Sequence, residues 1–116
     1  MSFQGSCHCG AVTFTVDAEL PEKALSCNCS ICRRKGSLLA FFPVDAFTLN
    51  SGQDRLTTYL FNSRQIHHQF CQVCGTEAFA HAKTPDGNKM YAINLRCVPD
   101  LDLDKLQIRH HDGANL

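Results

Sequence analysis

The sequence lacks a net charge, a long apolar segment and a secretory leader, and each absence excludes a class of protein. Eleven basic side chains balance eleven acidic ones, so no overall field would attract a polyanion, and nucleic acid is not an expected partner. The longest apolar run, Leu38–Phe42, ends at Pro43 and is far shorter than the roughly 20 residues that span a bilayer. We therefore expect no membrane span.

The N-terminal residues Met1–Gly5 carry neither the basic start nor the apolar stretch that a secretory signal needs. This start predicts a cytoplasmic protein. In a reducing compartment, cysteines at fixed spacing indicate metal binding or catalysis more readily than a disulfide framework. The expected compartment therefore favours metal sites as the role of the eight cysteines.

The chain of 116 residues fits one globular domain over residues 1–116 and is too short for two. A domain of this size is only marginally stable without cross-links, because the surface that it buries barely offsets the entropy lost in ordering the chain. The cysteines are the obvious source of such cross-links.

Short segments of alternating apolar and polar residues dominate the chain and predict an all-β fold. The first is Ala11–Val16, after which acidic residues and a proline interrupt the pattern. Turn signals separate the other expected strands, which are Ser37–Phe42, Phe47–Leu49, Leu56–Phe61, Ile66–Phe70, Thr76–Ala82, Met90–Leu95 and Leu106–Arg109. Short helical turns are expected only at Ser30–Lys35, which stops at Gly36, and around Val44–Ala46.

Two cysteine pairs, each closed by a glycine, predict a structural zinc site. A glycine at positive φ lets such a turn bend until backbone amides point at the thiolate sulfurs. Four thiolates about 2.3 Å from Zn²⁺ complete a tetrahedron and leave no vacancy. This metal would tie the start of the chain to its middle and supply much of the folding free energy. The ligands would be Cys7, Cys9, Cys71 and Cys74.

A third group, Cys27, Cys29 and Cys32, offers three ligands within six residues and no local fourth. Three protein ligands and one exchangeable position are typical of catalytic zinc. The alternative is a closed site, in which a residue from elsewhere in the chain folds back as the fourth ligand. The candidates for that ligand are Cys97, His67, His68 and His81.

Other roles of the cysteines fit the sequence less well than zinc binding. Redox dithiol chemistry at a C-x-x-C motif usually accompanies a βαβ unit, which this chain lacks. Cys97 stands apart from the motifs and is expected to be a small buried residue. His67 and His68 would point to opposite faces of a strand, so at most one of them could face a site.

The ordered motifs resemble those of the glutathione-dependent formaldehyde-activating enzyme family, which includes centromere protein V-like proteins. The resemblance covers most of the chain, through Cys7–Gly10, Cys27–Arg33, Phe42-Pro43, Cys71–Gly75 and Asn94–Cys97. It implies a β-tent fold of packed antiparallel sheets and two zinc ions per chain, one structural on the paired cysteines and one catalytic on the other three.

The family resemblance also implies an activity, the condensation of formaldehyde with glutathione to S-hydroxymethylglutathione, which is a carbon–sulfur lyase reaction run in reverse. The sequence departs from the family at its end. Many relatives have a longer C-terminal segment with an aromatic residue, often tryptophan, whereas this chain has no tryptophan and its sequence ends at Leu116. The departure weakens the transfer of substrate identity.

Charge favours a thiol as the fourth ligand of the three-cysteine site. Zn²⁺ with three thiolates has a formal charge of about −1 and therefore acidifies water less than a three-histidine site does. A bound thiol would stay ionised and electron-rich, and would thus be suited to attack a small aldehyde. The carboxylates of glutathione would pair with Arg33, Arg34 or Arg96, with Lys35 a weaker candidate.

Two other classes of function remain open at this point. The first is a zinc-stabilised binding module without turnover, in which Arg33–Lys35 contacts a protein or nucleic acid and the second zinc is structural. The second is a redox or metal sensor that releases zinc from the three cysteines on mild oxidation. The sequence also leaves open a homodimer and the proton carrier, for which the candidates are Tyr59, Tyr91, Glu77 and His81.

Overall fold

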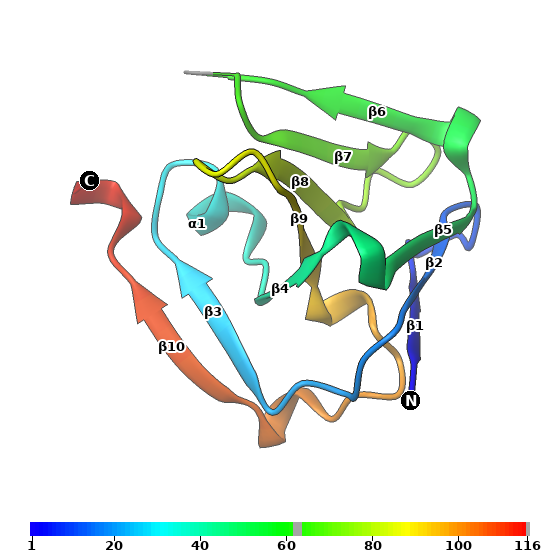
Figure 1. Ribbon diagram of the computed structural model, residues 1–116, viewed down its shortest axis with the longest axis horizontal. Helices are drawn as coiled ribbons and strands as arrows, with labels where there is room; N and C mark the ends of the chain where they lie inside the picture. The colour runs from blue at the N-terminus through cyan, green and yellow to red at the C-terminus, as the bar shows by residue number, and fades with distance from the viewer. Residues whose placement is uncertain (62–63, 116) are drawn as a thin grey trace.

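The computed structural model describes residues 1–61 and 64–115, which form two β-sheets with little helix (Figure 1). The small sheet has the strand order β1-β2-β5, with β1 at Phe3–Ser6, β2 at Thr13–Val16 and β5 at Phe47–Ser51. The large sheet has the order β10-β3-β4-β9-β8-β7-β6. Its strands are β3 (Lys23–Cys27), β4 (Leu39–Pro43), β6 (Leu56–Tyr59), β7 (His67–Cys71), β8 (Phe79–Lys83), β9 (Lys89–Asn94) and β10 (Gln107–His111).

Helical structure among the described residues is limited to single turns. The α-helix α1 (Cys32–Lys35) ends at Gly36, whose φ of 70° is the left-handed conformation that glycine adopts readily. The others are 3₁₀ turns, namely η1 (Val44–Ala46), η2 (Gln53–Arg55), η3 (Leu95–Cys97), η4 (Leu103–Lys105) and η5 (Gly113–Asn115). No described helix is long and apolar enough to cross a membrane.

The prediction of an all-β fold with short helical turns is confirmed, with two differences in the strands. The strands β1 and β3 were not expected from the alternation, because each is short and carries few large apolar residues. Pairing with neighbours defines them instead, as Phe3 pairs with Val16 in the small sheet. The pair β3 and β10 is also parallel, whereas the other pairs are antiparallel. Parallel strands need a long connection. In the sequence, the other five strands of the large sheet lie between β3 and β10, although these two strands are neighbours in the sheet.

A glycine makes the pairing of β1 with β2 possible. Gly5 lies opposite Phe14, and the ring of Phe14 fills the space where a Cβ on Gly5 would stand. The Phe14 side chain is fully buried as a result. Gly5 is therefore needed for the core, although glycine by itself weakens a strand.

Aromatic side chains from both sheets form the core between them. Phe14 in the small sheet contacts Phe79 in the large sheet edge to face, with ring centroids 5.9 Å apart. Phe47 stacks on Tyr91 with a centroid distance of 3.9 Å. Each fully buried aromatic ring stabilises the fold by about 1.5–3 kcal/mol relative to an exposed one. Cys7 and Cys71 belong to the same buried cluster, so the four paired cysteines lie at its margin.

Candidate metal centres and active-site cavity

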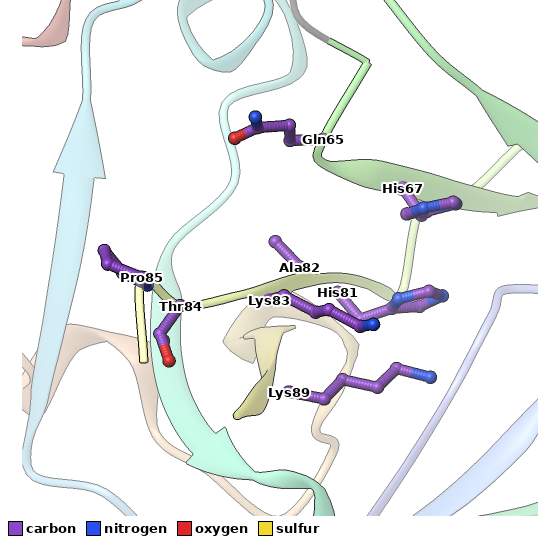
Figure 2. A pocket seen from close by; sticks show the side chains of 8 residues that line it. All are labelled: Gln65, His67, His81, Ala82, Lys83, Thr84, Pro85 and Lys89. Atoms are coloured by element: carbon purple, nitrogen blue, oxygen red, sulfur yellow. The ribbon is translucent and has the colours of Figure 1, made fainter. Parts of the chain in front are cut away.

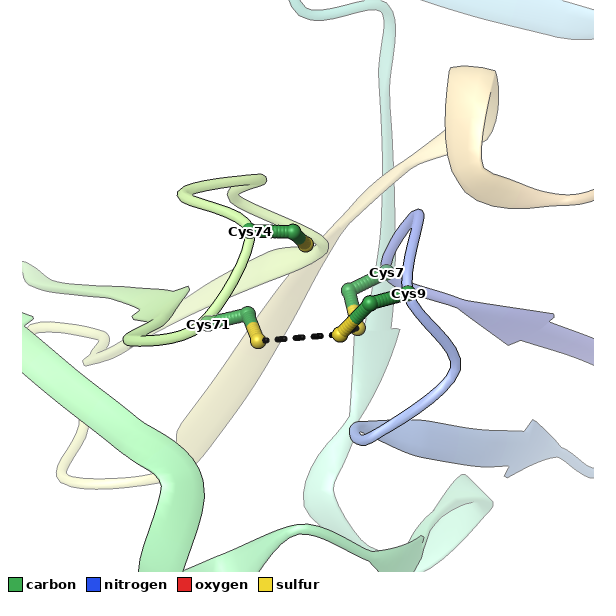
Figure 3. A group of neighbouring side chains, drawn as sticks. All are labelled: Cys7, Cys9, Cys71 and Cys74. Atoms are coloured by element: carbon green, nitrogen blue, oxygen red, sulfur yellow. Dashed lines mark hydrogen bonds between the residues drawn. The ribbon is translucent and has the colours of Figure 1, made fainter.

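The four paired cysteines converge from two distant turns (Figure 3). Cys7 and Cys9 lie in the turn between β1 and β2, whereas Cys71 ends β7 and Cys74 follows it. The sulfur of Cys9 is 3.7 Å from that of Cys7 and 3.7 Å from that of Cys71. A tetrahedron with metal–sulfur bonds of about 2.3 Å has edges of about 3.8 Å, whereas a disulfide would be about 2.05 Å long. The distances therefore fit four thiolates around one metal ion.

The turns that carry these cysteines have the backbone conformation that the sequence predicts. Gly10 has a φ of 82° and Gly75 a φ of 80°. The amide of Gly10 donates to the Cys7 carbonyl over 3.4 Å, and that of Gly75 donates to the Cys71 carbonyl over 2.8 Å. Both turns are thus closed by a glycine in a conformation that other residues adopt at a cost.

Backbone amides also point at the sulfurs. The Val12 amide donates to Cys7 Sγ over 3.3 Å, and the Val73 amide donates to Cys71 Sγ over 3.4 Å. Such hydrogen bonds stabilise the thiolate form, which is the form that binds metal. They orient the ligands of this group before a metal ion binds.

The thiols of this group influence one another strongly. The hydroxyl of Thr76 and nearby backbone amides lower the pKa of Cys74 to about 5. The Ala11 amide would lower the pKa of Cys9, but burial and the neighbouring thiols outweigh it and raise this pKa to about 11. Four sulfurs at these distances cannot all be ionised without a cation between them. The electrostatics therefore support a metal site.

The second cluster contains Cys27, Cys29 and Cys32, whose sulfurs all lie within 4.8 Å of one another. Cys27 ends β3, Cys29 lies in the following loop, and Cys32 begins α1. Among the described residues, no fourth histidine, cysteine or acidic side chain joins them. The closed alternative is thus not seen for any of its candidate ligands, which were Cys97, His67, His68 and His81.

Local contacts shift the pKa values of Cys29 and Cys32 in opposite directions. Burial raises the pKa of Cys32, and the thiols of Cys29 and Cys27 raise it further. Burial would also raise the pKa of Cys29, but the backbone amide of Cys32 and neighbouring thiols lower it instead. The Cys29 amide donates to Cys27 Sγ over 3.4 Å. In this loop, as in the four-cysteine turns, a backbone amide donates a hydrogen bond to a cysteine sulfur.

The C-terminal strand holds the three-cysteine loop in place. Cys27 pairs with His111 of β10 in the parallel register. Beyond the strand, the Asn28 side chain donates to the Asp112 carboxylate over 2.9 Å and accepts from the Ala114 amide over 2.9 Å. Asn28 therefore connects the loop to the C-terminal residues through both ends of its amide group.

The glycine between these contacts leaves room for a ligand sulfur. A Cβ on Gly113 would lie 2.6 Å from Cys27 Sγ and 3.2 Å from the Cβ of Cys29. We expect Gly113→Ala to displace a sulfur and weaken metal binding at the three-cysteine site by about 10–100-fold, as changes around metal ligands do. Competition with a zinc chelator measures the change. The matched control Ala114→Ser, at the exposed neighbour, should bind metal as the wild type does, and equal affinities for the two variants would contradict the prediction.

The three-cysteine cluster opens into a cavity of about 510 Å³. Its walls come from β3, α1, β4 and the strands β7–β9. A cavity of this size with mostly apolar walls and few polar groups is typical of small-molecule sites. The apolar walls include Leu25, Ile31, Leu39, Phe41, Ala80, Met90 and Ala92, and the polar side chains besides the cysteines are Lys35, Ser37, His68, Glu77, His81, Lys83, Thr84 and His111.

An ionic cluster of one exposed and two largely buried side chains lies in the wall of this cavity. Lys35 Nζ is 2.9 Å from Glu77 Oε1, and His68 Nδ1 is 3.4 Å from Glu77 Oε2. Burial would raise the pKa of Glu77, but the hydrogen bonds and charges of His68 and Lys35 outweigh it and lower this pKa. Glu77 is thus a largely buried carboxylate that stays ionised in the wall of the cavity that the three cysteines also line.

A second hollow, of about 790 Å³, lies on the neighbouring surface of β8 (Figure 2). His67 and His81 stack there with ring centroids 4.7 Å apart. Burial, Lys89 and His67 lower the pKa of His81 to about 4, so this ring is neutral at neutral pH. Among the residues that the structure describes, no cysteine or acidic side chain lines this hollow. We therefore place the candidate active site in the smaller cavity, which the three cysteines and Glu77 line.

The three arginines predicted to bind substrate lie outside the cavity lining. Arg33 and Arg34 are exposed on α1, and Arg34 donates to the Ser30 carbonyl over 2.8 Å. Arg96 donates to the Gly36 carbonyl over 2.8 Å. Their role in binding stays a prediction, and it would concern a part of the substrate that extends beyond the cavity.

The predicted proton carriers divide into two groups. Glu77 and His81 line the cavity, whereas Tyr59 and Tyr91 do not. Nothing in the sequence connects Glu77 with His68, for which the sequence suggests only a role as a metal ligand. His68 lies on β7, whereas Glu77 lies in the segment before the adjacent strand β8, and the path of that segment has no signature in the sequence.

Comparison with known proteins agrees with this picture. The protein family described as glutathione-dependent formaldehyde-activating enzyme matches residues 2–111. The fold is also similar to the crystal structure of a Rhodobacter sphaeroides protein, with a TM-score of 0.79 and 28% sequence identity. The similarity covers 93% of this chain and 99% of the other. The chain belongs to the glutathione-dependent formaldehyde-activating enzyme family.

Proposed function

We propose that this protein joins glutathione to formaldehyde at the cluster of Cys27, Cys29 and Cys32. The product would be S-hydroxymethylglutathione, so the enzyme would be a carbon–sulfur lyase that works in the reverse direction. The observation that carries the proposal is a three-thiol cluster, without a fourth protein ligand among the described residues, that opens into a cavity of about 510 Å³. A closed structural site would have neither feature.

We further propose zinc as the metal of both clusters, giving two ions per chain. Thiolate ligands in a tetrahedral arrangement favour zinc over the hard cations, which prefer oxygen. The four-cysteine site would be structural, because its ligands complete the coordination sphere. Zinc on Cys27, Cys29 and Cys32 would supply a vacant position for the substrate sulfur and keep that sulfur ionised.

The cavity itself would select a thiol and a small aldehyde. Its mostly apolar walls would suit the methylene next to the substrate sulfur, and formaldehyde needs little further space. Lys83 in the lining, together with Arg33, Arg34 and Arg96 outside it, would meet the carboxylates of glutathione. All eight cysteines are free thiols, which supports a cytoplasmic location.

The function can be tested by NMR with ¹³C-formaldehyde and glutathione at equilibrium. The two compounds also combine without a catalyst, so the measured quantity is the exchange rate between free and thiol-bound formaldehyde. We expect zinc-loaded protein to accelerate this exchange in proportion to its concentration. Exchange at the uncatalysed rate would contradict the proposed function. Salt-sensitive binding to nucleic acid in that case would favour the binding module instead.

A further inference from the structure

The buried pair of His68 and Glu77 lies in the cavity wall and belongs to neither cysteine cluster. The side chain of His68 is 8% exposed and that of Glu77 is 9% exposed. Buried charged groups are costly to a fold unless they are paired, and they concentrate at functional sites. Two ionisable groups in the wall of a cavity that three cysteines also line therefore require an explanation beyond packing.

The two nitrogens of His68 have different surroundings. Nδ1 faces Glu77 Oε2 at 3.4 Å, whereas Nε2 is buried and has no hydrogen-bond partner within the described part of the chain. A carboxylate beside Nδ1 favours the tautomer that carries its proton there. Nε2 then has a free lone pair. This arrangement resembles the base of a catalytic triad, in which an acidic residue orients a histidine toward a nucleophile.

Lys35 connects this pair to the cysteine loop. It occupies the last position of α1, the helix that begins at Cys32, and its ammonium group is 2.9 Å from Glu77. It also lies over the ring of Phe70, 5.5 Å from the centroid. The ion pair keeps Glu77 ionised and fixes its position relative to the helix that supplies one of the three sulfurs. A movement of α1 would therefore move Glu77, and a movement of Glu77 would move α1.

The proposed reaction needs a group that moves one proton. Glutathione enters as a thiol, and its sulfur must lose a proton before it attacks the carbonyl carbon of formaldehyde. The carbonyl oxygen must gain a proton as the carbon–sulfur bond forms and the carbon–oxygen double bond becomes single. One proton is therefore taken from sulfur and one is delivered to oxygen, and no oxidant or reductant takes part.

We propose that His68 is the catalytic proton carrier of this reaction and that Glu77 is its positioning residue. His68 accepts the thiol proton at Nε2 and later returns it to the aldehyde oxygen, while Glu77 stabilises the charged ring through Nδ1. This inference rests on the proposed function. His81 also lines the cavity, but its ring stacks on His67 and faces cationic Lys89 rather than a carboxylate.

The kinetic test compares His68→Gln with His67→Gln, the same change at the adjacent residue on the opposite face of β7. We expect His68→Gln to lower kcat by about 100-fold or more, with little change in KM and an unchanged zinc content. His67→Gln should keep wild-type kinetics. Added imidazole should restore part of the activity of His68→Gly, which a purely structural loss would not allow. A kcat of His68→Gln within about threefold of the wild type would overturn the inference.

A second readout does not depend on turnover. In ¹⁵N NMR spectra of the zinc-loaded protein, His68 should be protonated at Nδ1 and not at Nε2, and Glu77→Gln should weaken this preference. Glutathione without formaldehyde should shift the Nε2 resonance. If the wild type accelerates no exchange, the proposed function fails, and a thiol-induced shift at Nε2 would still support His68 as the proton acceptor. A protonated Nε2, or no response to thiol, would overturn the inference even in an active enzyme.

Discussion

Cys71→Ser is expected to unfold most of the protein under conditions in which the wild type is folded. Cys71 is completely buried, belongs to the core cluster and holds one of the four positions of the proposed structural zinc. Zinc binding to such a site is worth about 10–16 kcal/mol, whereas a small domain has a net stability of only about 5–15 kcal/mol. Loss of this zinc would therefore exceed what the remaining contacts can offset.

Circular dichroism and thermal melting of the purified variant measure this effect. Cys97→Ala is the matched control, because Cys97 is partly buried but belongs to neither cluster. Its sulfur lies 4.0 Å from the Glu77 carbonyl, and its loss should cost about 1 kcal/mol, as an ordinary core change does. A Cys71→Ser protein that melts cooperatively near the wild-type temperature would show that this cluster does not hold a structural metal.

Cys29→Ser is expected to abolish activity while the fold survives. Cys27, Cys29 and Cys32 lie outside the core cluster, and the pairing of β3 with β4 and β10 does not involve Cys29. The variant should retain the structural zinc and lose the other. A catalytic metal contributes several kcal/mol to the transition state, and each ~1.36 kcal/mol is a factor of ten, so the rate should fall by about 1,000-fold or more.

The measurements are zinc content by mass spectrometry of the folded protein and the formaldehyde exchange rate. We expect two zinc ions per chain in the wild type, one in Cys29→Ser, and similar melting temperatures for both. The two cysteine variants thus separate the roles of the clusters. An active Cys29→Ser variant would remove this cluster from the reaction, and an unfolded one would make it structural.

The strand pattern was predictable where large apolar side chains alternate with polar ones. Thr13–Val16 alternates as expected, and its inward residues Phe14 and Val16 are fully buried. The strand Phe3–Ser6 has no such pattern, because Gly5 has no side chain. Its contribution to the core is the space that the ring of Phe14 occupies. Its strand character depends on its partner, and the sequence of a single strand does not contain that information.

The cysteine clusters were predictable because each C-x-C or C-x-x-C motif within them is local in the sequence. Within each motif the turn fixes the distance between neighbouring cysteines, so spacing alone indicates the site. The ionic cluster of His68, Glu77 and Lys35 was not predictable in the same way. Its members come from β7, the turn before β8 and α1, and only the packing of these elements brings them together.

The most direct test of the account is the spectrum of the cobalt-substituted protein during a titration with glutathione. Co²⁺ in place of zinc reports each sulfur ligand through its charge-transfer bands. We expect two cobalt ions per chain and an additional sulfur-to-cobalt band as one equivalent of glutathione binds to the three-cysteine site. A single bound metal ion, or a spectrum that glutathione leaves unchanged, would contradict the claim that this cluster binds the substrate sulfur.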